Sequence, residues 1–401
     1  MKKICLSVVG LYITMFAGFG QKTPADTTYK SRKLTFEEAN LVSSYYKQNG
    51  NNSAVAGGIG TEKLTDLATI IDVKLHKWDK RNRKHIFDFE LGIDHYSSAS
   101  SDLVDLKNNS SASSADTRIY PSINWSVENE KKGTMVGAGL SYSTEFDYQS
   151  IGINAGFSKK TNNRSGEFTV KAQAYLDKVS LILPTELRPT GLGSGNDDEN
   201  SYPKTSRNSF SGSFSYSQII NERLQVALLL DIIYQQGYLS LPFHRVYFAD
   251  NSVHQENLPD SRMKIPIGLR ANYFMGDKII LRSYYRYYHD DWGLNAHTFN
   301  LEMPIKITPF LSIGPFYRYY NQGATKYFAP YKTHTDADQF YTSNYDVSKF
   351  NSNFYGAGFR IAPPKGVFGL SHVNMLEIRY GHYTRTTGLN SDIISLNLKF
   401  K

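Results

Sequence analysis

Residues 86–96, IFDFELGIDHY, decide the fold of this chain. If the backbone is extended, one face carries Phe87, Phe89, Leu91 and Ile93, and the opposite face carries Asp88, Glu90, Gly92 and Asp94. Successive side chains of a strand point to opposite faces, so this alternation predicts a strand with one apolar and one aqueous side. A strand of this kind and length is the building unit of a barrel that crosses a membrane.

The same alternation recurs along the chain from residue 54 to the C-terminus. It is clear in residues 209–216, 263–274 and 394–400, whereas helical periodicity is nearly absent. The composition agrees, because 29 Tyr and 23 Phe accompany a mean hydropathy of only −0.43. A polar average with many aromatic residues is typical of strands that face lipid on one side and water on the other.

The connections alternate between long and short, as they do in bacterial barrels with long outer loops and short periplasmic turns. The long ones are residues 97–116, 179–208, 237–261 and 321–351, and the short ones are residues 77–84, 129–133, 159–166, 221–223, 275–278 and 308–310. An even strand count requires one more strand, for which residues 54–60 are the candidate. The sequence thus predicts an all-β transmembrane antiparallel up-and-down β-barrel of about 16 strands.

The N-terminus predicts export. Lys2 and Lys3, an apolar run and small residues near Gly20 are typical of a signal peptide over residues 1–20, which contains the only cysteine, Cys5. Residues 21–53 are predicted to be a periplasmic or plug segment with a short helix from Leu34 to Tyr46, because Thr35 and Glu38 have the spacing of a capping box. Residues 54–401 would then be the barrel.

The predicted location is the outer membrane, and lipid is the first expected partner. The terminal strand, with Phe400 before Lys401, resembles the signal read by the barrel-insertion machinery. The formal charge of +8 is spread along the chain without a long basic cluster, so nucleic acid is not an expected partner. A soluble β-sandwich or propeller is the alternative fold, but the chain lacks the repeat of roughly 40 residues of a propeller.

Three stretches carry a family resemblance: YYKQNGNNSAVAGGIGTEKLTD (45–66), VSLILPTELRP (179–189) and GYLSLPFHRVYF (237–248). They resemble an uncharacterised family of Bacteroidota outer-membrane proteins classed as a domain of unknown function. The resemblance implies export and a barrel, and no site residues. It also implies an envelope partner such as a small lipoprotein, within a redox or metal-handling system, from the genes that accompany the family.

Charged residues on the polar strand faces are the candidate site. A basic wall of the lumen is predicted from Lys264, Arg270, Arg282, Arg286, Lys306, Arg318, Arg360, Arg379 and Arg385, and an acidic row from Asp88, Glu90 and Asp94. The acidic row lies seven or eight strands from the basic wall, which is roughly across the barrel. Opposed walls would place a transverse field across a pore, whereas simple pairing and hydration of lumen residues is the alternative reading.

Other candidates are weaker. Asp197, Asp198 and Glu199 could hold a divalent cation through oxygen ligands, although the spacing is not that of an EF-hand, and no other cofactor is expected. The histidines are scattered, and His289 beside Asp290 and Asp291 is read as a surface turn rather than a catalytic group, so no enzyme activity is predicted. One set of aromatic residues is predicted to form membrane girdles (Tyr285, Tyr287, Tyr317, Tyr319, Tyr355 and Tyr383). A second set, in the long loops, is predicted to pack over the mouth, inside the lumen or against a partner (Tyr327, Phe328, Tyr331, Phe340, Tyr341 and Tyr345).

Three functions remain open from the sequence. The first is a porin-like or gated channel for small polar solutes, because about sixteen strands leave room for an aqueous path. The second is an occluded barrel that acts as a scaffold and binds an envelope partner through the N-terminal helix or the aromatic loops. The third, an outer-membrane enzyme, has no motif in its favour.

Overall fold

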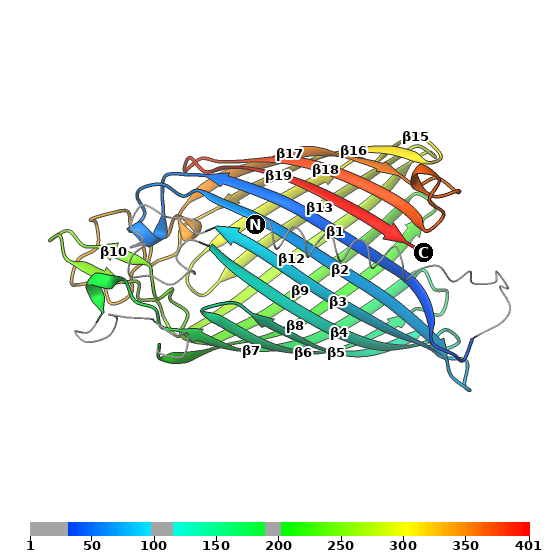
Figure 1. Ribbon diagram of the computed structural model, residues 1–401, viewed down its shortest axis with the longest axis horizontal. Coiled ribbons are helices and arrows are strands. Elements are labelled where there is room, and N and C mark those ends of the chain that lie inside the picture. Colours follow the sequence, from blue (N-terminus) through cyan, green and yellow to red (C-terminus); the bar gives the residue numbers. More distant parts are fainter. Residues whose placement is uncertain (1–30, 98–114, 189–201) are drawn as a thin grey trace.

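The computed structural model describes residues 31–97, 115–188 and 202–401, which form one closed antiparallel barrel of 16 strands (Figure 1). The strands that cross the wall are β1 (Thr35–Asn49), β2 (Leu64–Trp78), β3 (Lys84–Ser97), β4 (Ala115–Asn129), β5 (Thr134–Thr144), β6 (Tyr148–Lys160), β7 (Gly166–Ser180), β8 (Lys204–Asn221), β9 (Leu224–Gly237), β12 (Ser261–Met275), β13 (Ile279–Asp290), β14 (Asn295–Glu302) with β15 (Ile305–Thr308), β16 (Leu311–Gln322), β17 (Phe350–Ile361), β18 (Val373–Arg385) and β19 (Asn390–Phe400). β10 (Arg245–Tyr247) and β11 (Val253–Gln255) form a separate small hairpin. The predicted fold class and strand number are confirmed.

β14 and β15 are two pieces of one membrane crossing, since both lie between β13 and β16. Met303 and Pro304 interrupt this strand. Proline has no N–H to donate to a neighbouring strand, so a break at this position is expected.

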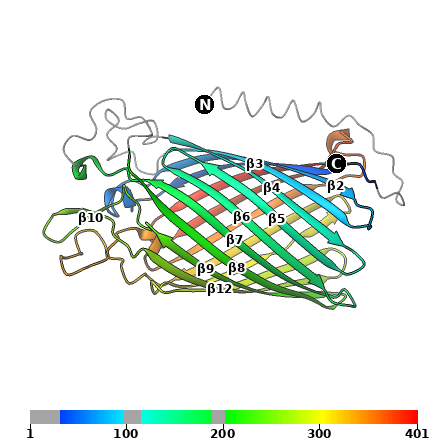
Figure 2. The same cartoon turned by 90° about the horizontal axis from the view of Figure 1, so that it is seen from below.

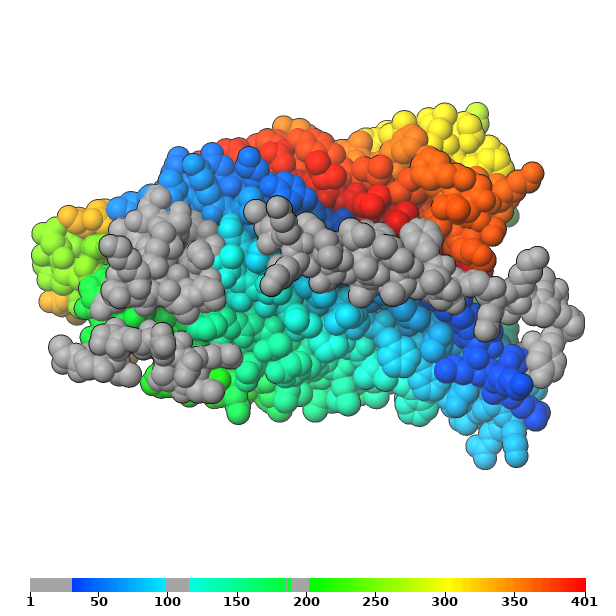
Figure 3. All heavy atoms as spheres, viewed as in Figure 1, coloured from blue at the N-terminus to red at the C-terminus, as the bar shows by residue number. Residues whose placement is uncertain are grey.

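The barrel closes where β1 pairs with β19. Their register runs from Ala39 opposite Phe400 to Asn49 opposite Asn390, and the blue and red surfaces of the two strands adjoin in Figure 3. β1 also pairs with β2 along its length. Because both edges are paired, no strand edge of the wall is left open to lipid, where unsatisfied backbone groups would be costly.

β1 corrects the prediction for the N-terminal segment. Residues 35–49 form a strand, which includes nearly all of the helix predicted from Leu34 to Tyr46. The barrel therefore begins well before residue 54. The capping-box spacing was misleading because hydrogen bonds to two neighbouring strands outweigh local helix propensity. Glu38 and Asn40 face Lys74 and Asp72 across the lumen side, which is the period-two alternation of a barrel strand.

Residues 54–60 are not a strand either. Ala54–Ala56 form the 3-10 turn η1, and Gly57, Gly58 and Gly60 have φ values of 77°, 85° and 79°. Positive φ is incompatible with a β-strand and favours glycine. The total strand count is nevertheless right, because β1 takes the place that these residues were expected to fill.

The two faces of the wall differ as the alternation predicts. Large apolar side chains on one face are exposed, including Phe89, Leu140, Ile153, Leu228, Leu269 and Ile378. Residues with the opposite parity, such as Glu90 and Arg282, line cavities inside the barrel. An apolar outer band on a closed antiparallel barrel places the protein in the outer membrane. No helix among the described residues has the length and apolar character needed to cross a membrane.

The predicted aromatic girdle is correct except at one position. Tyr285, Tyr317, Tyr319 and Tyr355 are exposed on the outer face, and Tyr287 shares the parity of Tyr285. Tyr383 is the exception, because its register partner is Phe354 and its hydroxyl accepts a hydrogen bond from Arg385 on the lumen side. Tyr383 faces the lumen because of its position in the alternation of β18, not because of its chemistry.

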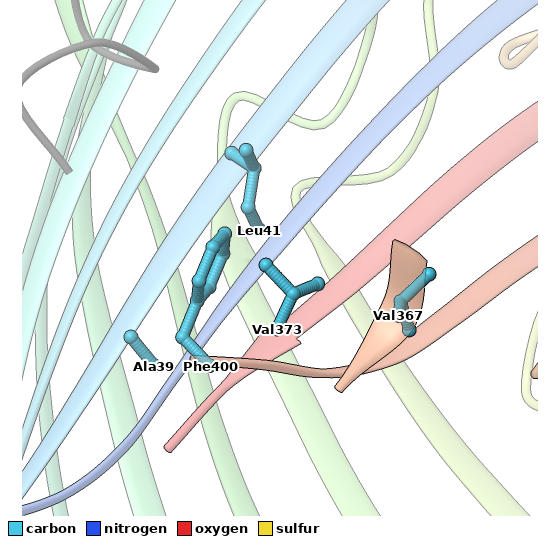
Figure 4. Close-up of a cluster of buried hydrophobic side chains, with 5 residues drawn as sticks. All are labelled: Ala39, Leu41, Val367, Val373 and Phe400. Atoms are coloured by element: carbon cyan, nitrogen blue, oxygen red, sulfur yellow. The ribbon is translucent and has the colours of Figure 1, made fainter. Parts of the chain in front are cut away.

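An apolar cluster joins the closing seam to one end of the barrel. Ala39, Leu41, Val367, Val373 and Phe400 pack together (Figure 4). Val367 belongs to the 3-10 turn η6 (Val367–Gly369), which connects β17 to β18. The turn thus packs against the strands that close the barrel.

The two ends of the barrel are built differently (Figure 2). All the predicted short turns lie at the end that holds the C-terminus and the start of β1, and all the predicted long connections lie at the other end. By the rule for bacterial barrels, the turn end faces the periplasm and the loop end faces outward.

Candidate functional site

The predicted basic wall lies on the lumen face of neighbouring strands. Arg270 faces Tyr284 in the β12–β13 register, and Arg282 faces Asn272 in the same pair. The remaining members of the wall share this lumen parity and are Lys264, Arg286, Lys306, Arg318, Arg360, Arg379 and Arg385. Arg262 extends the wall toward the loop end.

Only part of the basic wall is neutralised. Glu302 lies 3.4 Å from both Arg282 and Arg379, and Arg379 also pairs with Glu377 at 3.3 Å. Among the described residues, six cations of the wall make no ion pair: Lys264, Arg270, Arg286, Lys306, Arg318 and Arg360. The Nε of Arg286 is buried and has no hydrogen-bond partner there. A buried donor without a partner is available to a solute.

The predicted acidic row lies on the lumen face of β3 and continues onto both neighbours. Asp88 faces Lys74 and Glu90 faces Asp72 in the β2–β3 register, and Asp94 faces Arg118 of β4. Lys74 lies 3.9 Å from Asp88 and 3.4 Å from Glu38. This wall therefore carries its own counter-charges, although acidic residues predominate on it.

The two walls lie opposite each other. In the ring of strands, β3 is followed by β4 to β9 and then by β12 and β13, so half the ring separates β3 from β13. A solute in the lumen would thus have carboxylates on one side and guanidinium groups on the other.

The outer mouth is bridged by a roof, the name used here for residues 50–63, 238–260 and 323–349. Arg245, in the second of these segments, is only 7% exposed. Its Nη1 donates to the carbonyl oxygen of Val55 at 2.9 Å, and its Nε and Nη2 donate to the Glu186 carboxylate. The loop of Val55 joins β1 to β2, whereas that of Arg245 joins β9 to β12, half the ring away. The contact therefore crosses the mouth.

A buried carboxylate fixes the third segment of the roof. Glu256 is 4% exposed and accepts hydrogen bonds from the amide of Leu241 and the hydroxyl of Thr342. His244 Nδ1 lies 3.5 Å from Glu256 Oε1. Burial opposes ionisation of Glu256, but His244, Thr342 and the Leu241 amide together hold the pKa of its carboxyl below the usual range.

The aromatic residues predicted to lie at the mouth pack inside the roof. Tyr331 lies on Tyr247, Tyr341 lies edge-on to Phe248, and Phe328 contacts Tyr345. Tyr327 packs against Phe340 and against Trp292 of the neighbouring loop. Of the three places considered for these rings, the structure selects the mouth.

Close packing also explains two glycines of the roof. A Cβ on Gly57 would lie 2.5 Å from the ring of Tyr247, and one on Gly58 would lie 2.6 Å from the Ser343 carbonyl oxygen. Both have a positive φ. Residues 50–63 can therefore seat against the other two segments only with glycine at these positions.

Glu62 gives the roof a pH dependence. Burial, reinforced by the carboxylate of Asp346 and opposed by Arg385, raises the pKa of Glu62 from 4.5 to about 7. The closed roof therefore favours the protonated form, so this contribution to its stability is complete below about pH 4.5 and is lost as the pH rises through about 7.

We expect amide hydrogen exchange in residues 50–63, corrected for intrinsic rates, to be several-fold faster at about pH 8 than at about pH 5.5. Glu62→Gln should remove this difference because the amide does not ionise. Asp250→Asn, a change at an exposed carboxylate of the roof, is the matched control and should preserve it. A pH difference that persists in Glu62→Gln would refute the assignment.

Some predicted residues lie elsewhere. The possible cation ligands Asp197, Asp198 and Glu199 fall outside the described residues, and the described ones contain no cluster of three His, Cys, Asp or Glu suited to a metal ion. Asp290 is buried and accepts hydrogen bonds from Arg262, Tyr288 and the Leu294 amide. It holds the β13–β14 loop, and His289 next to it has the outward parity.

Sequence reasoning missed the contacts of the roof but not the residues. The three stretches that carry the family resemblance contain Val55, Glu186 and Arg245, and the structure brings these three residues together. Glu302 and Glu377, the counter-charges of the basic wall, were also missed. Extending the alternation rule to acidic residues of the same strands would have found them.

Comparison with known proteins identifies a family. Residues 90–386 match the model of a family described as "Protein of unknown function (DUF3570)", which confirms the resemblance to an uncharacterised family. This match includes the second and third of the quoted stretches, whereas the first, residues 45–66, lies wholly before it. No curated protein matches the chain in sequence.

Several solved structures are similar in fold. OccK1 (OpdK) of Pseudomonas aeruginosa is 8% identical, with a TM-score of 0.41 over 93% of this chain and 99% of that chain. OccD3 (OpdP) of the same organism is 9% identical, with a TM-score of 0.44 over 94% of each chain. A variant of the ferric enterobactin receptor (PfeA) of P. aeruginosa is 10% identical, with a TM-score of 0.45 over 87% of this chain and 53% of that chain.

Proposed function

Because the chain belongs to the DUF3570 family of proteins of unknown function, its function has to be argued from its own lumen, and we propose that it is a gated outer-membrane channel for small polar solutes. The observation that carries the proposal is the pair of opposed charged walls. A lumen that served only as a structural core could be filled with apolar side chains, whereas charges remain hydrated only where water enters.

The walls also indicate which ions the channel favours. The unpaired cations near Arg270, Arg286 and Arg318 outnumber the counter-charges close to them, whereas the acidic wall holds Lys74 and Arg118 among its carboxylates. The lumen should thus favour anions over cations while orienting solutes that carry both charges. The roof supplies the gate, because its contacts cross the outer mouth.

The alternative of a scaffold gains no specific support from the described residues. A scaffold was expected to bind its envelope partner through the N-terminal helix or the aromatic loops. β1 occupies the residues of that helix, and the aromatic side chains of residues 327–345 contact other parts of the roof. The channel therefore remains the better-supported function.

Liposome swelling tests the proposal. Proteoliposomes that contain the folded protein should swell in isotonic solutions of small polar solutes such as glycine or glucose, and more slowly in a large solute such as stachyose. Empty liposomes and liposomes with a heat-denatured sample are the controls. Equal swelling rates with and without the folded barrel would contradict a solute path.

A further inference from the structure

A polar cavity lies inside the lumen near the outer mouth. It has a volume of about 490 Å³, and its lining comes from β3 to β7 and from the loop of residues 145–147. Small-molecule sites in proteins have volumes of roughly 300–1,000 Å³. The cavity is therefore large enough for a compact solute, and it lies on the acidic side of the barrel, away from the basic wall.

Asp177 is the residue that points to a ligand. Its side chain lines the cavity although the residue is only 7% exposed. The Tyr148 hydroxyl donates to its Oδ2, but its Oδ1 is buried without a hydrogen-bond partner. Buried carboxylate oxygens are rarely left unpaired, because the desolvation is not repaid. A donor supplied by a solute would complete this site.

The nearest cation does not neutralise Asp177. Arg207 faces Asp177 in the β7–β8 register, but its guanidinium donates to the carbonyl oxygens of Tyr238 and Ser240, each at 2.8 Å. No ion pair joins Arg207 to Asp177 in the part of the chain that the structure describes. Arg207 is therefore not the hydrogen-bond partner of the Asp177 carboxylate.

The rest of the lining is suited to a cation larger than a metal ion. Glu90 and Glu145 add carboxylates, and the rings of Tyr120, Tyr148 and Tyr175 border the same space. Aromatic faces attract organic cations, and carboxylates bind their N–H groups. The absence of a three-residue metal cluster among the described residues agrees with this, because the acidic groups are spread around the cavity.

Two basic residues also line the cavity, and one of them has its own partners. The Arg118 guanidinium stacks on Tyr120 with 4.6 Å between its Cζ and the ring centroid, and its Nε donates to Ser143 Oγ at 3.1 Å. Lys171 faces Gly156 and Ser213 in the registers of β7. Asp94 and Asp116 lie in the same region and add negative charge.

We propose that this cavity is a binding site for a small organic cation that carries amino groups. The ammonium group donates to the free Oδ1 of Asp177 and lies against the tyrosine rings, and Glu90 or Glu145 receives a second donor. This goes beyond the proposed channel function, because binding at the site does not require that the solute cross the membrane.

Calorimetric titration of the full-length folded barrel in detergent tests the site. The probes are spermidine and putrescine, with glucose as a neutral probe and citrate as an anionic one. Titrations are repeated in the Glu256→Ala background, so that the roof does not limit access. We expect binding of at least one amine, weakened roughly tenfold or more by Asp177→Asn, which keeps the size of the side chain and the acceptor for Tyr148.

Glu128→Gln is the matched control. Glu128 is a carboxylate of β4 that pairs with Lys160 at 3.3 Å and does not line the cavity, so amine affinity should be unchanged. Amine binding that survives Asp177→Asn, or binding of glucose or citrate but of neither amine, would overturn the proposal. So would the absence of binding by any probe, whatever the swelling and conductance results show about the channel.

Discussion

Replacement of Glu256 by alanine is expected to open the roof and to raise the rate of solute entry into proteoliposomes at least roughly tenfold. The change leaves the Leu241 amide and the Thr342 hydroxyl without their buried acceptor. A buried donor left unsatisfied costs roughly 1–3 kcal/mol, so the loss at two donors corresponds to about tenfold or more in the ratio of open to closed roof. The measurement is liposome swelling, with circular dichroism to show that the strands remain.

Asp250→Ala is the matched control for this experiment. Asp250 belongs to the same roof segment, but it is exposed and bonds only to Ser252 nearby. Its loss should leave solute entry within about twofold of the native rate. A Glu256→Ala barrel that is folded and passes solutes no faster than the native protein would show that this buried carboxylate does not close the path.

Reversal of charge on the basic wall is the second change with a large expected effect. In Arg282→Glu with Arg286→Glu, the preference for anions should shift strongly toward cations, because two lumen cations become anions. The change at residue 282 places a new carboxylate beside Glu302, the present partner of Arg282, where it repels anions further. The measurement is the reversal potential across a bilayer under a salt gradient, which should change sign or approach zero.

Lys131→Glu is the control for total charge. Lys131 is exposed in the turn between β4 and β5, outside the lumen. Reversing it should leave the reversal potential nearly unchanged, because exposed charges farther away than about 10 Å are screened at 0.1 M salt. An identical reversal potential in native and double-variant barrels would show that ions do not pass along the wall.

Local alternation predicted most of the wall. Strands such as β3 and β12 carry their period-two pattern in their own residues, because one face meets lipid and the other meets water. Lys264, Arg286 and Asp88 could therefore be assigned to the lumen from their parity alone. The number of strands between β3 and β13 then predicted that the two walls lie opposite each other.

β1 shows where local reasoning fails. Its residues combine a helix-like start with a mixed polar pattern, and their strand conformation depends on β2 and β19, of which β19 lies at the other end of the sequence. The contacts of the roof could not be predicted for the same reason. The contact of Arg245 with Val55 joins residues that no local pattern relates. The residues of the roof could therefore be noted in the sequence, but their contacts could not be predicted.

Single-channel recording of the Glu256→Ala barrel in a planar bilayer under a KCl gradient tests whether the charged lumen conducts, because it measures conduction and charge preference together after the roof is released. We expect sustained unitary currents with a reversal potential on the anion-selective side, and only brief openings from the native protein. A correctly folded variant that produces no current above that of the bare bilayer would contradict the claim that the charged lumen is a path for solutes.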